Sequence, residues 1–308
     1  MFKNLHELFT KMPTEQDCRD YLAAQRWADG KAVCPSCGCD RCYTILGGKR
    51  YKCSDKECKR QFSVVAGTVF ECSNIPLSKW FYAIYVATAH KKGISSHQLA
   101  RDLGITQKSA WFVLHRVREI TGCKVADKLD GIIEIDEVYV GGKNHNKHKK
   151  EREAINKLGT GYMNKVGVLG ILQRGKEVRL KVIGLDNQGI YLKPIIRENV
   201  ATTAQLVTDG FGGYKDLKYE FTDHQIVNHS KDEFVRGDWH TNGVEGFFSH
   251  FRRMVYGVYH SVTPKHLASY CNECAYRYNT RDLKDHERFT LSLRNVSGRL
   301  THKALIAR

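Results

Sequence analysis

Apolar residues in the first 120 positions recur every three or four residues, which is the spacing of amphipathic helices. Residues 1–30 are predicted to be helical, whereas residues 31–72 form a compact stretch rich in cysteine and turn-forming residues. A longer helix is predicted to begin at Pro76, because proline suits the first position of a helix, and to end at Gly93. It carries apolar side chains at helical spacing, namely Leu77, Trp80, Phe81, Ile84 and Tyr85.

Two short helices separated by a glycine are predicted next. Ser95 or Ser96 can cap the first helix. Gly104 supplies the turn, and Thr106 can cap the second helix. The second helix is predicted to bury its apolar side chains, which are Ala110, Val113, Leu114 and Val117. Two helices joined by a short glycine turn make the helix-turn-helix pattern, which we predict here.

The character of the chain changes after Asp130, where β-branched residues become frequent. Strands are predicted at residues 132–140, 166–172, 178–184, 204–209 and, more weakly, 225–227. Helices are predicted at residues 191–198, 241–254 and 264–280. Three strands, a helix, two further strands and then helices predict an α/β domain of the ribonuclease-H type.

The chain is strongly basic. Lys and Arg total 49 against 33 Asp and Glu, which gives a formal net charge of +16. Such a surplus favours a polyanionic partner, because each phosphate contact releases condensed counterions. The first residues lack an apolar core of signal-peptide length, and no run of about 18 apolar residues occurs. We therefore expect a cytoplasmic, nucleoid-associated protein.

Six of the eleven cysteines fall within 25 consecutive positions, from residue 34 to residue 58. In a reducing compartment such clustering favours a metal site over disulfides. Two pairs separated by 15 residues suit one structural Zn²⁺ in tetrahedral geometry. The predicted ligands are Cys34, Cys37, Cys53 and Cys58. A spare pair, Cys39 and Cys42, could replace Cys37 or bind a second ion.

Three carboxylates occur in an order that suits metal-dependent phosphodiester chemistry. Asp136 lies within the first strand of the α/β part, Asp209 ends a later strand, and Glu245 lies on the following helix. Cleavage by an oxygen nucleophile needs two metal ions roughly 3.5–4 Å apart, and Mg²⁺ or Mn²⁺ prefers the oxygens of Asp and Glu. Each acid alone would more often be structural, but the ordered set predicts a site for two ions.

The helix that carries Glu245 has two faces. Its apolar face comprises Val244, Phe247, Phe248 and Phe251, and its second face comprises Asn242, Glu245, Ser249 and Arg252. We predict that Asn242 and Arg252 support catalysis, because an amide and a cation beside a carboxylate can help to grip a phosphate. Glu134 and Glu137 flank Asp136 and are alternative candidates for its place among the three carboxylates. Glu134 shares the strand face of Asp136, whereas Glu137 points to the opposite face.

The second helix of the predicted helix-turn-helix directs polar side chains outward. These candidate DNA contacts are Gln107, Lys108, Ser109 and Arg116. Such a helix can enter a major groove with its N-terminal side chains on base edges. The alternative is a plain helical pair that packs on the next domain.

These patterns divide the chain into five predicted parts. They are an N-terminal helical segment at 1–30, a zinc ribbon at 31–72, a helix-turn-helix domain at 73–125, a ribonuclease-H-like catalytic domain at 126–282 and a C-terminal tail at 283–308.

Several motifs follow one another in a defined order. In the cysteine-rich part they are Cys34-Pro35-Ser36-Cys37-Gly38, Tyr51-Lys52-Cys53, Gln61-Phe62-Ser63 and Gly67-Thr68-Val69-Phe70. In the α/β part they are Glu134-Ile135-Asp136-Glu137-Val138-Tyr139-Val140-Gly141-Gly142-Lys143, Thr208-Asp209-Gly210, His240-Thr241-Asn242-Gly243-Val244-Glu245-Gly246-Phe247-Phe248-Ser249, Arg252, Gly257-Val258-Tyr259-His260 and Pro264-Lys265-His266-Leu267. With these motifs the chain resembles, from about residue 15 to about residue 280, the ISXO-type bacterial insertion-sequence DDE transposases that carry an N-terminal zinc ribbon.

The resemblance implies a ribonuclease-H-like core, Mg²⁺ or Mn²⁺, and binding to the terminal inverted repeats of a mobile element. It carries Asp136, Asp209 and Glu245 over as the triad that holds the metal ions. Two features depart from the family pattern. Arg252 stands where the family often has Lys, and the second cysteine pair is more widely spaced. Because some relatives use Asn as the third ligand, Asn242 remains a supporting candidate.

We therefore predict a transposase in which water cleaves the strand at the element's end and the freed 3′-hydroxyl attacks target DNA. Bringing two ends together favours a homo-oligomer on double-stranded DNA. A DNA-binding regulator without catalysis is the main alternative, but it leaves the ordered carboxylates unexplained. Two further alternatives are an inactive relict and a metal-dependent nuclease without a joining step.

Overall fold

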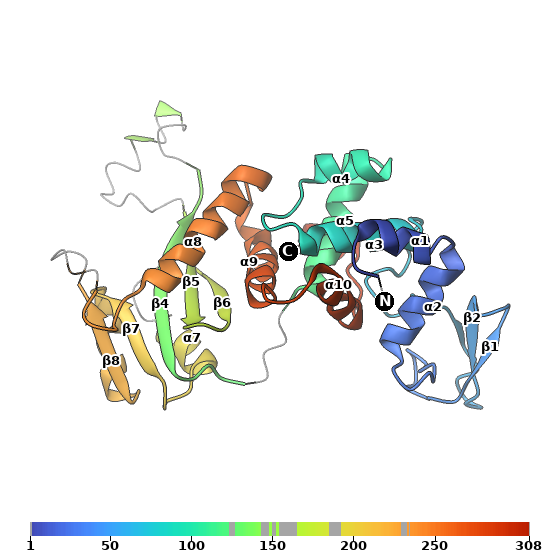
Figure 1. The fold of residues 1–308 in the computed structure, drawn as a ribbon, viewed down its shortest axis with the longest axis horizontal. Coiled ribbons are helices and arrows are strands. Elements are labelled where there is room, and N and C mark those ends of the chain that lie inside the picture. Colours follow the sequence, from blue (N-terminus) through green and yellow to red (C-terminus); the bar gives the residue numbers. More distant parts are fainter. Residues whose placement is uncertain are drawn as a thin grey trace. The chain divides into compact units, whose positions relative to one another are not determined.

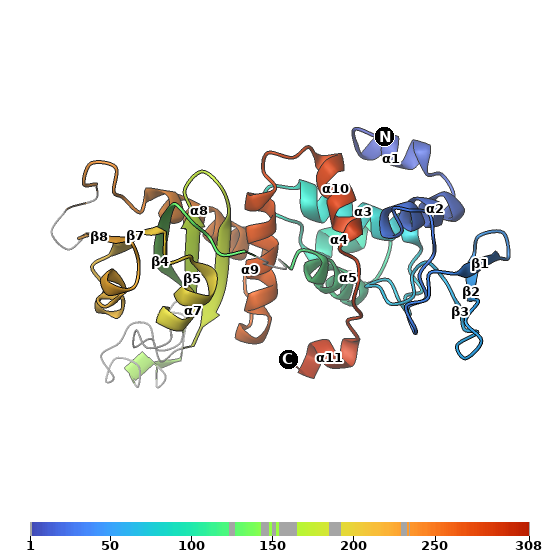
Figure 2. The same cartoon turned by 90° about the horizontal axis from the view of Figure 1, so that it is seen from below.

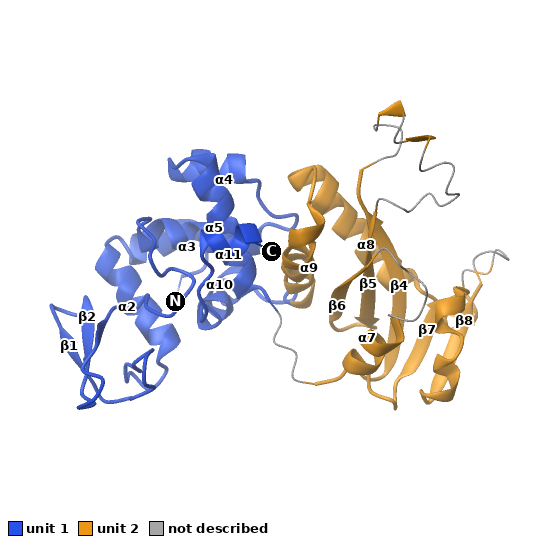
Figure 3. Cartoon of the chain, turned by 180° about the vertical axis from the view of Figure 1, so that it is seen from behind, with its two compact units in different colours: residues 1–122, 280–308 blue, residues 123–279 orange. Residues whose placement is uncertain are grey.

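Both ends of the sequence contribute to the first of two units (Figure 3). This first unit combines residues 1–122 with residues 280–308, and the second unit comprises residues 123–279. The computed structural model describes residues 2–122, 127–142, 148–149, 152–153, 165–184, 192–228, 233 and 235–307. The order of helices and strands can be followed in Figure 1.

The first unit begins with two helices and a small sheet. Its elements are α1 (Leu5–Lys11), α2 (Glu15–Arg26), β1 (Cys42–Ile45), β2 (Arg50–Cys53) and β3 (Gln61–Phe62). Thr14 and Asp17 form a reciprocal capping box that satisfies the free N–H groups at the start of α2. The three strands pair antiparallel in the order β1-β2-β3, so the cysteine-rich stretch folds around a hairpin.

Three helices follow the cysteine-rich stretch; the predicted caps of the second and third are confirmed, whereas the first ends at Ala89, before the predicted Gly93. They are α3 (Leu77–Ala89), α4 (Ser96–Leu103) and α5 (Gln107–Ile120). The Ser95 hydroxyl accepts a bond from the Gln98 N–H at 3.1 Å, and the Thr106 hydroxyl accepts one from the Ser109 N–H at 3.2 Å. Gly104 ends α4 with a φ of 58°, a conformation that favours glycine.

The predicted C-terminal tail is wrong. Residues in this range form α10 (Asp285–Arg294) and α11 (His302–Ala307). Phe289 and Leu293 of α10 are fully buried in the same core as Phe81 of α3. The stretch is therefore part of the first unit, because its apolar side chains complete a core that the N-terminal helices leave open.

The described strands of the second unit form one mixed sheet. They are β4 (Ile132–Val140), β5 (Val166–Gln173), β6 (Val178–Ile183), β7 (Gln205–Asp209) and β8 (Asp223–Val227), in the spatial order β6-β5-β4-β7-β8. The first three pair antiparallel, whereas β7 and β8 join β4 as parallel strands. The sheet is buried on two faces, which explains the near-continuous apolar character of β5.

Helices cover each face of this sheet (Figure 2). They are α7 (Leu192–Asn199), α8 (Asn242–Met254) and α9 (Pro264–Asn279). Side chains of α8 and α9 share a core with Val138 and Val168, whereas α7 packs with Ile135 and Ile171 on the opposite face. Among the described residues, no helix combines the length and apolar character needed to cross a membrane.

Candidate active site and metal centre

The four predicted zinc ligands come together in the first unit. One ligand atom from each of Cys34, Cys37, Cys53 and Cys58 lies within 4.8 Å of the other three. The sulfur atoms of Cys34 and Cys58 are 3.7 Å apart, and those of Cys37 and Cys53 are 3.6 Å apart. Four thiols at these separations suit one tetrahedral Zn²⁺, and four cysteine ligands leave no open position for catalysis. The arrangement supports a structural zinc ion.

The spare cysteine pair stands outside this group. The Cys39 sulfur faces the carbonyl oxygen of Arg41 at 3.6 Å, and the Cys42 sulfur faces the carbonyl oxygen of Cys39 at 3.6 Å.

Burial raises the pKa of the Cys34 thiol, but backbone N–H groups oppose this effect and bring the pKa to about 7.

Two of the predicted catalytic acids lie on neighbouring strands. In the parallel pairing of β4 with β7, Ile135 stands opposite Thr208. Asp136 and Asp209 are the next residues on their strands, so their side chains leave the same face of the sheet from adjacent positions. Both residues are half-buried. The Asp136 carboxylate accepts the Glu137 N–H at 2.8 Å, and Asp209 accepts the Phe211 N–H at 3.0 Å.

The face that carries these two acids is the one covered by α8. Asp136 pairs with Gly170 of β5, and residues directly opposite each other share a face. A Cβ atom at Gly170 would lie only 2.6 Å from the Phe248 ring, so helix and sheet approach closely at this point. Helix α8 therefore packs on the face of β4 and β5 that carries Asp136, and Asp209 belongs to the same face on the neighbouring strand β7.

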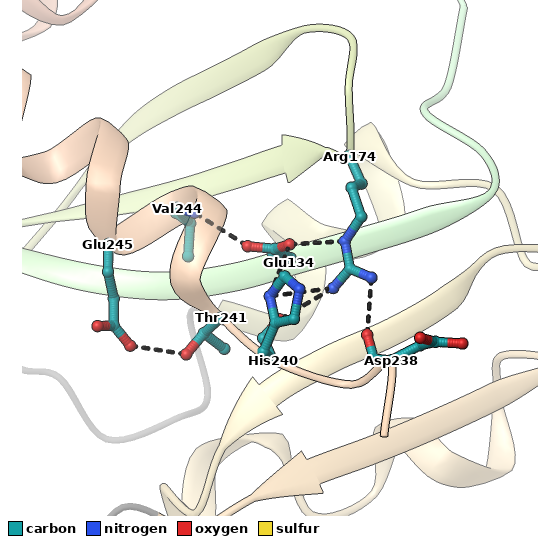
Figure 4. A network of polar contacts seen from close by, with 7 residues as sticks. All are labelled: Glu134, Arg174, Asp238, His240, Thr241, Val244 and Glu245. Atoms are coloured by element: carbon teal, nitrogen blue, oxygen red, sulfur yellow. Dashed lines mark hydrogen bonds and ion pairs between the residues drawn. The ribbon is translucent and has the colours of Figure 1, made fainter. Parts of the chain in front are cut away.

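The third predicted acid belongs to α8. Glu245 is half-buried and accepts a 2.7 Å hydrogen bond from the Thr241 hydroxyl (Figure 4). In the described part of the chain, the four cysteines are the one group whose ligand atoms all lie within 4.8 Å of one another. The three acids are thus on the same side of the sheet without converging that tightly.

The other predicted residues of α8 lie along its accessible side. Asn242 and Arg252 are exposed. Ser249 lies between them along the helix, and its hydroxyl donates to the Glu245 carbonyl at 3.3 Å. The apolar face predicted for this helix is confirmed, because Val244, Phe247, Phe248 and Phe251 are all buried. The polar face therefore remains available to a ligand.

Glu134, the rival on the same strand face as Asp136, is fully buried and already engaged. Its carboxylate accepts hydrogen bonds from Arg174 at 2.8 Å and from the Val244 N–H at 3.0 Å (Figure 4). Arg174 stands 40 residues from its partner, so no local sequence pattern pointed to it. The sequence signal for such a partner was an acid between two isoleucines of a predicted strand, because a carboxylate buried there needs a cation or hydrogen-bond donors.

Glu137, the rival on the opposite face, accepts a hydrogen bond from the Tyr214 hydroxyl. Burial raises the pKa of Glu137 to about 7, and the nearby charges of Asp136 and Asp209 act in the same direction, whereas the Tyr214 hydrogen bond opposes them. The charges of Asp136 and Asp209 are therefore close enough to Glu137 to disfavour its ionised form. Tyr214, which sequence reasoning missed, is fully buried beside them.

The predicted DNA contacts on α5 divide into two groups. Gln107 and Lys108 are exposed at the start of the helix and Ser109 is half-buried. The prediction that Arg116 points outward is wrong. Its side chain is buried, donates to the Leu300 carbonyl at 3.1 Å and lies over the Phe112 ring at 4.5 Å. The C-terminal segment covers this position, which local periodicity could not reveal.

Two family models match this chain, one in each of the parts just described. Residues 128–279 match the ISXO2-like transposase domain, and residues 13–61 match the transposase zinc-ribbon domain. A protein described as "Uncharacterized protein in transposable element ISH50", from Halobacterium salinarum, is 30% identical over 254 residues, covering 78% of this chain and 83% of the relative. An "Uncharacterized transposase-like protein" of Haemophilus influenzae is 31% identical over 97 residues, which is 32% of this chain and 77% of the relative.

A zinc-ribbon cysteine cluster followed by a mixed α/β transposase domain defines the class as transposase-like. The chain belongs to the ISXO2-like transposase family, which confirms the resemblance seen in its motifs.

Proposed function

We propose that this protein is an insertion-sequence transposase that binds the element's terminal inverted repeats, cleaves a DNA strand and transfers its end to target DNA. Asp136, Asp209 and Glu245 form the catalytic triad of this proposal, within a domain of the ribonuclease-H type. The observation that supports it is the register of β4 with β7, which gives the two aspartates adjacent positions on the face of the sheet where α8 packs.

The donor set fits hard divalent cations. Carboxylate oxygens are the ligands that Mg²⁺ and Mn²⁺ prefer, and two ions about 3.5–4 Å apart need carboxylates distributed around both. Acids that share a face without converging on one point are compatible with that requirement. When bound, two such ions would activate the attacking oxygen and stabilise the leaving oxygen of the phosphodiester.

The chain's own residues supply position and charge. The three carboxylates hold negative charge on the α8 side of the sheet, and Arg252 offers an exposed cation two turns beyond Glu245. A guanidinium can grip a phosphate through two parallel hydrogen bonds. We assign to Arg252 the orientation of the DNA backbone, and to Asn242 a supporting polar contact beside the carboxylates.

DNA recognition is assigned to the first unit. Helices α4 and α5 with the Gly104 turn have the order of a helix-turn-helix, and Gln107, Lys108 and Ser109 stand at the start of its second helix. Such a position suits contacts to base edges. The net charge of +16 favours the phosphate backbone. Since two element ends must be joined to one target, we propose a homo-oligomer on DNA.

Replacing Asp209 with Asn tests the triad. The amide keeps the size of the side chain but removes a charged metal ligand, so cleavage of inverted-repeat DNA with Mg²⁺ should fall at least about 100-fold. Binding to the same DNA in a gel-shift assay should be unchanged. Asp216→Asn is the matched control, because Asp216 is an exposed acid of the same unit that pairs with Lys193.

Retained cleavage by Asp209→Asn would contradict the triad assignment. Specific DNA binding by the wild-type chain without metal-dependent cleavage would instead favour a regulator.

A further inference from the structure

A buried network connects the strand of Asp136 with the helix of Glu245 (Figure 4). At its centre, the Glu134 carboxylate is 0% exposed. One oxygen accepts from Arg174 Nε at 2.8 Å and lies 3.6 Å from His240 Nδ1, and the other accepts from the Val244 N–H at 3.0 Å. Arg174 also donates to the carbonyl oxygens of Asp238 at 2.7 Å and His240 at 3.1 Å.

Helix α8 begins directly on this carboxylate. Val244 is in the first turn of the helix, where N–H groups have no partner within the helix itself. A negative charge at this end is favoured by the helix dipole. A Cβ atom at Gly243 would lie 2.7 Å from a Glu134 oxygen, so glycine permits the close approach. The carboxylate thus caps α8 from a neighbouring strand.

The chain leading into the helix is held by the same group of residues. Arg174 follows the end of β5 and reaches two carbonyl oxygens in the segment just before α8. One ion pair therefore anchors both the approach to the helix and its first turn. The segment before α8 must keep this course for the Asp238 and His240 carbonyl oxygens to accept from Arg174.

We propose that Glu134 is a positioning residue that sets the location of Glu245 relative to Asp136. Glu134 is two residues before Asp136 on the same strand face, and the N–H group that it binds belongs to the residue just before Glu245. This inference rests on the proposed function, since it names what the network positions. It assigns Glu134 a role other than metal ligand, because Arg174 and Val244 occupy its two oxygens.

Glu134→Gln in the full chain tests the inference. Glutamine keeps the shape and one acceptor oxygen but removes the charge that faces Arg174. Free Mn²⁺, measured by electron paramagnetic resonance during a titration, reports ion binding without requiring cleavage. Loss of an outer partner of a metal site lowers affinity or activity by roughly 10- to 100-fold. We expect a shift of that size in Mn²⁺ affinity and in the Mn²⁺ dependence of inverted-repeat cleavage.

Glu273→Gln is the matched control. Glu273 of α9 is also buried in the second unit, pairs with Arg277 and accepts a hydrogen bond from the Tyr259 hydroxyl at 2.6 Å. This control therefore removes a comparable buried charge without touching the start of α8. It should keep wild-type Mn²⁺ affinity even if its thermal stability falls. Equal Mn²⁺ affinity in Glu134→Gln and Glu273→Gln would overturn the positioning role.

Arg174→Lys provides a second variant should Glu134→Gln fail to fold. Lysine keeps the positive charge near Glu134 but cannot reach both carbonyl oxygens with a planar fork. A weaker Mn²⁺ affinity supports the proposal, and wild-type affinity overturns it. If Mn²⁺ binding depends on Asp209 and Glu134 while the wild-type chain does not cleave DNA, the positioning role holds and the proposed function fails.

Discussion

Glu134, Asp136 and Glu137 stand within four residues of β4, yet each carboxylate has a different environment. Glu134 is buried and paired with Arg174, Asp136 is half-buried in the middle of the strand, and Glu137 faces Tyr214 on the other side. The alternation of strand side chains explains the division between faces. Burial and partner then separate the two acids on the α8 side, and this leaves Asp136 as the acid beside Asp209.

His224 on β8 gives a residue-level prediction of pH dependence. Its Nε2 atom is 2.9 Å from the Thr208 hydroxyl, and within the described chain its Nδ1 atom is buried without a hydrogen-bond partner. Burial lowers the pKa of His224, although the charge of Asp223 opposes this effect. The unfolded chain therefore binds the proton more readily than the folded chain does. Stability from this group is present in full above the unfolded pKa, about 6.5, and is lost as the pH falls towards the lower folded pKa.

Replacing His224 with Gln should reduce the loss of unfolding free energy between pH 7.5 and pH 5.5. Urea denaturation at the two pH values measures this difference. His97→Gln is the control, because His97 is exposed. An unchanged pH dependence in His224→Gln would show that another group causes the acid sensitivity.

At the level of elements, the position of α8 on the sheet depends on a missing side chain. Gly170 of β5 faces Phe248 and Val244, which pack where a side chain would otherwise stand. Helix and strand can approach this closely only because no Cβ intervenes. The contact holds α8 against the sheet at Gly170, the residue that pairs with Asp136.

Gly170→Ala should destabilise the second unit by about 1–3 kcal/mol, because the new methyl group would overpack the contact with Phe248. Gly246→Ala is the contrasting variant on α8 itself. Gly246 is exposed with open space around it, so alanine should stabilise the helix by about 0.5–1 kcal/mol. Urea unfolding measures both changes. Equal effects of the two substitutions would show that the helix does not depend on the close approach.

At the scale of the whole molecule, the chain returns at its end to the unit where it began. Phe289 packs its ring against Phe2, Phe81 and Tyr85 in the core of the first unit. Arg288 donates to the Thr88 carbonyl at 2.9 Å, across 200 residues of sequence. The second unit is thus an insertion between two parts of the first.

Phe289→Ala should cost about 3–5 kcal/mol of unfolding free energy in the first unit, because it opens a cavity among buried aromatic rings. Hydrogen exchange followed by peptide mass analysis assigns the loss to residues 1–122 and 280–308. Leu283→Ala is the control at an exposed site nearby and should change stability by less than about 0.5 kcal/mol. A small effect of Phe289→Ala would mean that the C-terminal helices contribute little to this core.

The sequence by itself determined what depends on local spacing. The helices and strands before residue 280, the serine and threonine caps and the four clustered cysteines follow, within a few residues, from local periods and intervals. The faces of β4 and α8 follow from the same rules, so Asp136 and Glu245 could be selected as candidate site residues, whose catalytic role remains a prediction.

Only the tertiary structure decided which distant residues meet. Glu134 is paired with Arg174 across 40 residues, and Arg116 is covered by the Leu300 segment across 184. Local periodicity describes which side of an element is apolar, but it carries no information on what packs there. For that reason the C-terminal stretch was mistaken for a tail, and the network that holds the start of α8 was visible only in three dimensions.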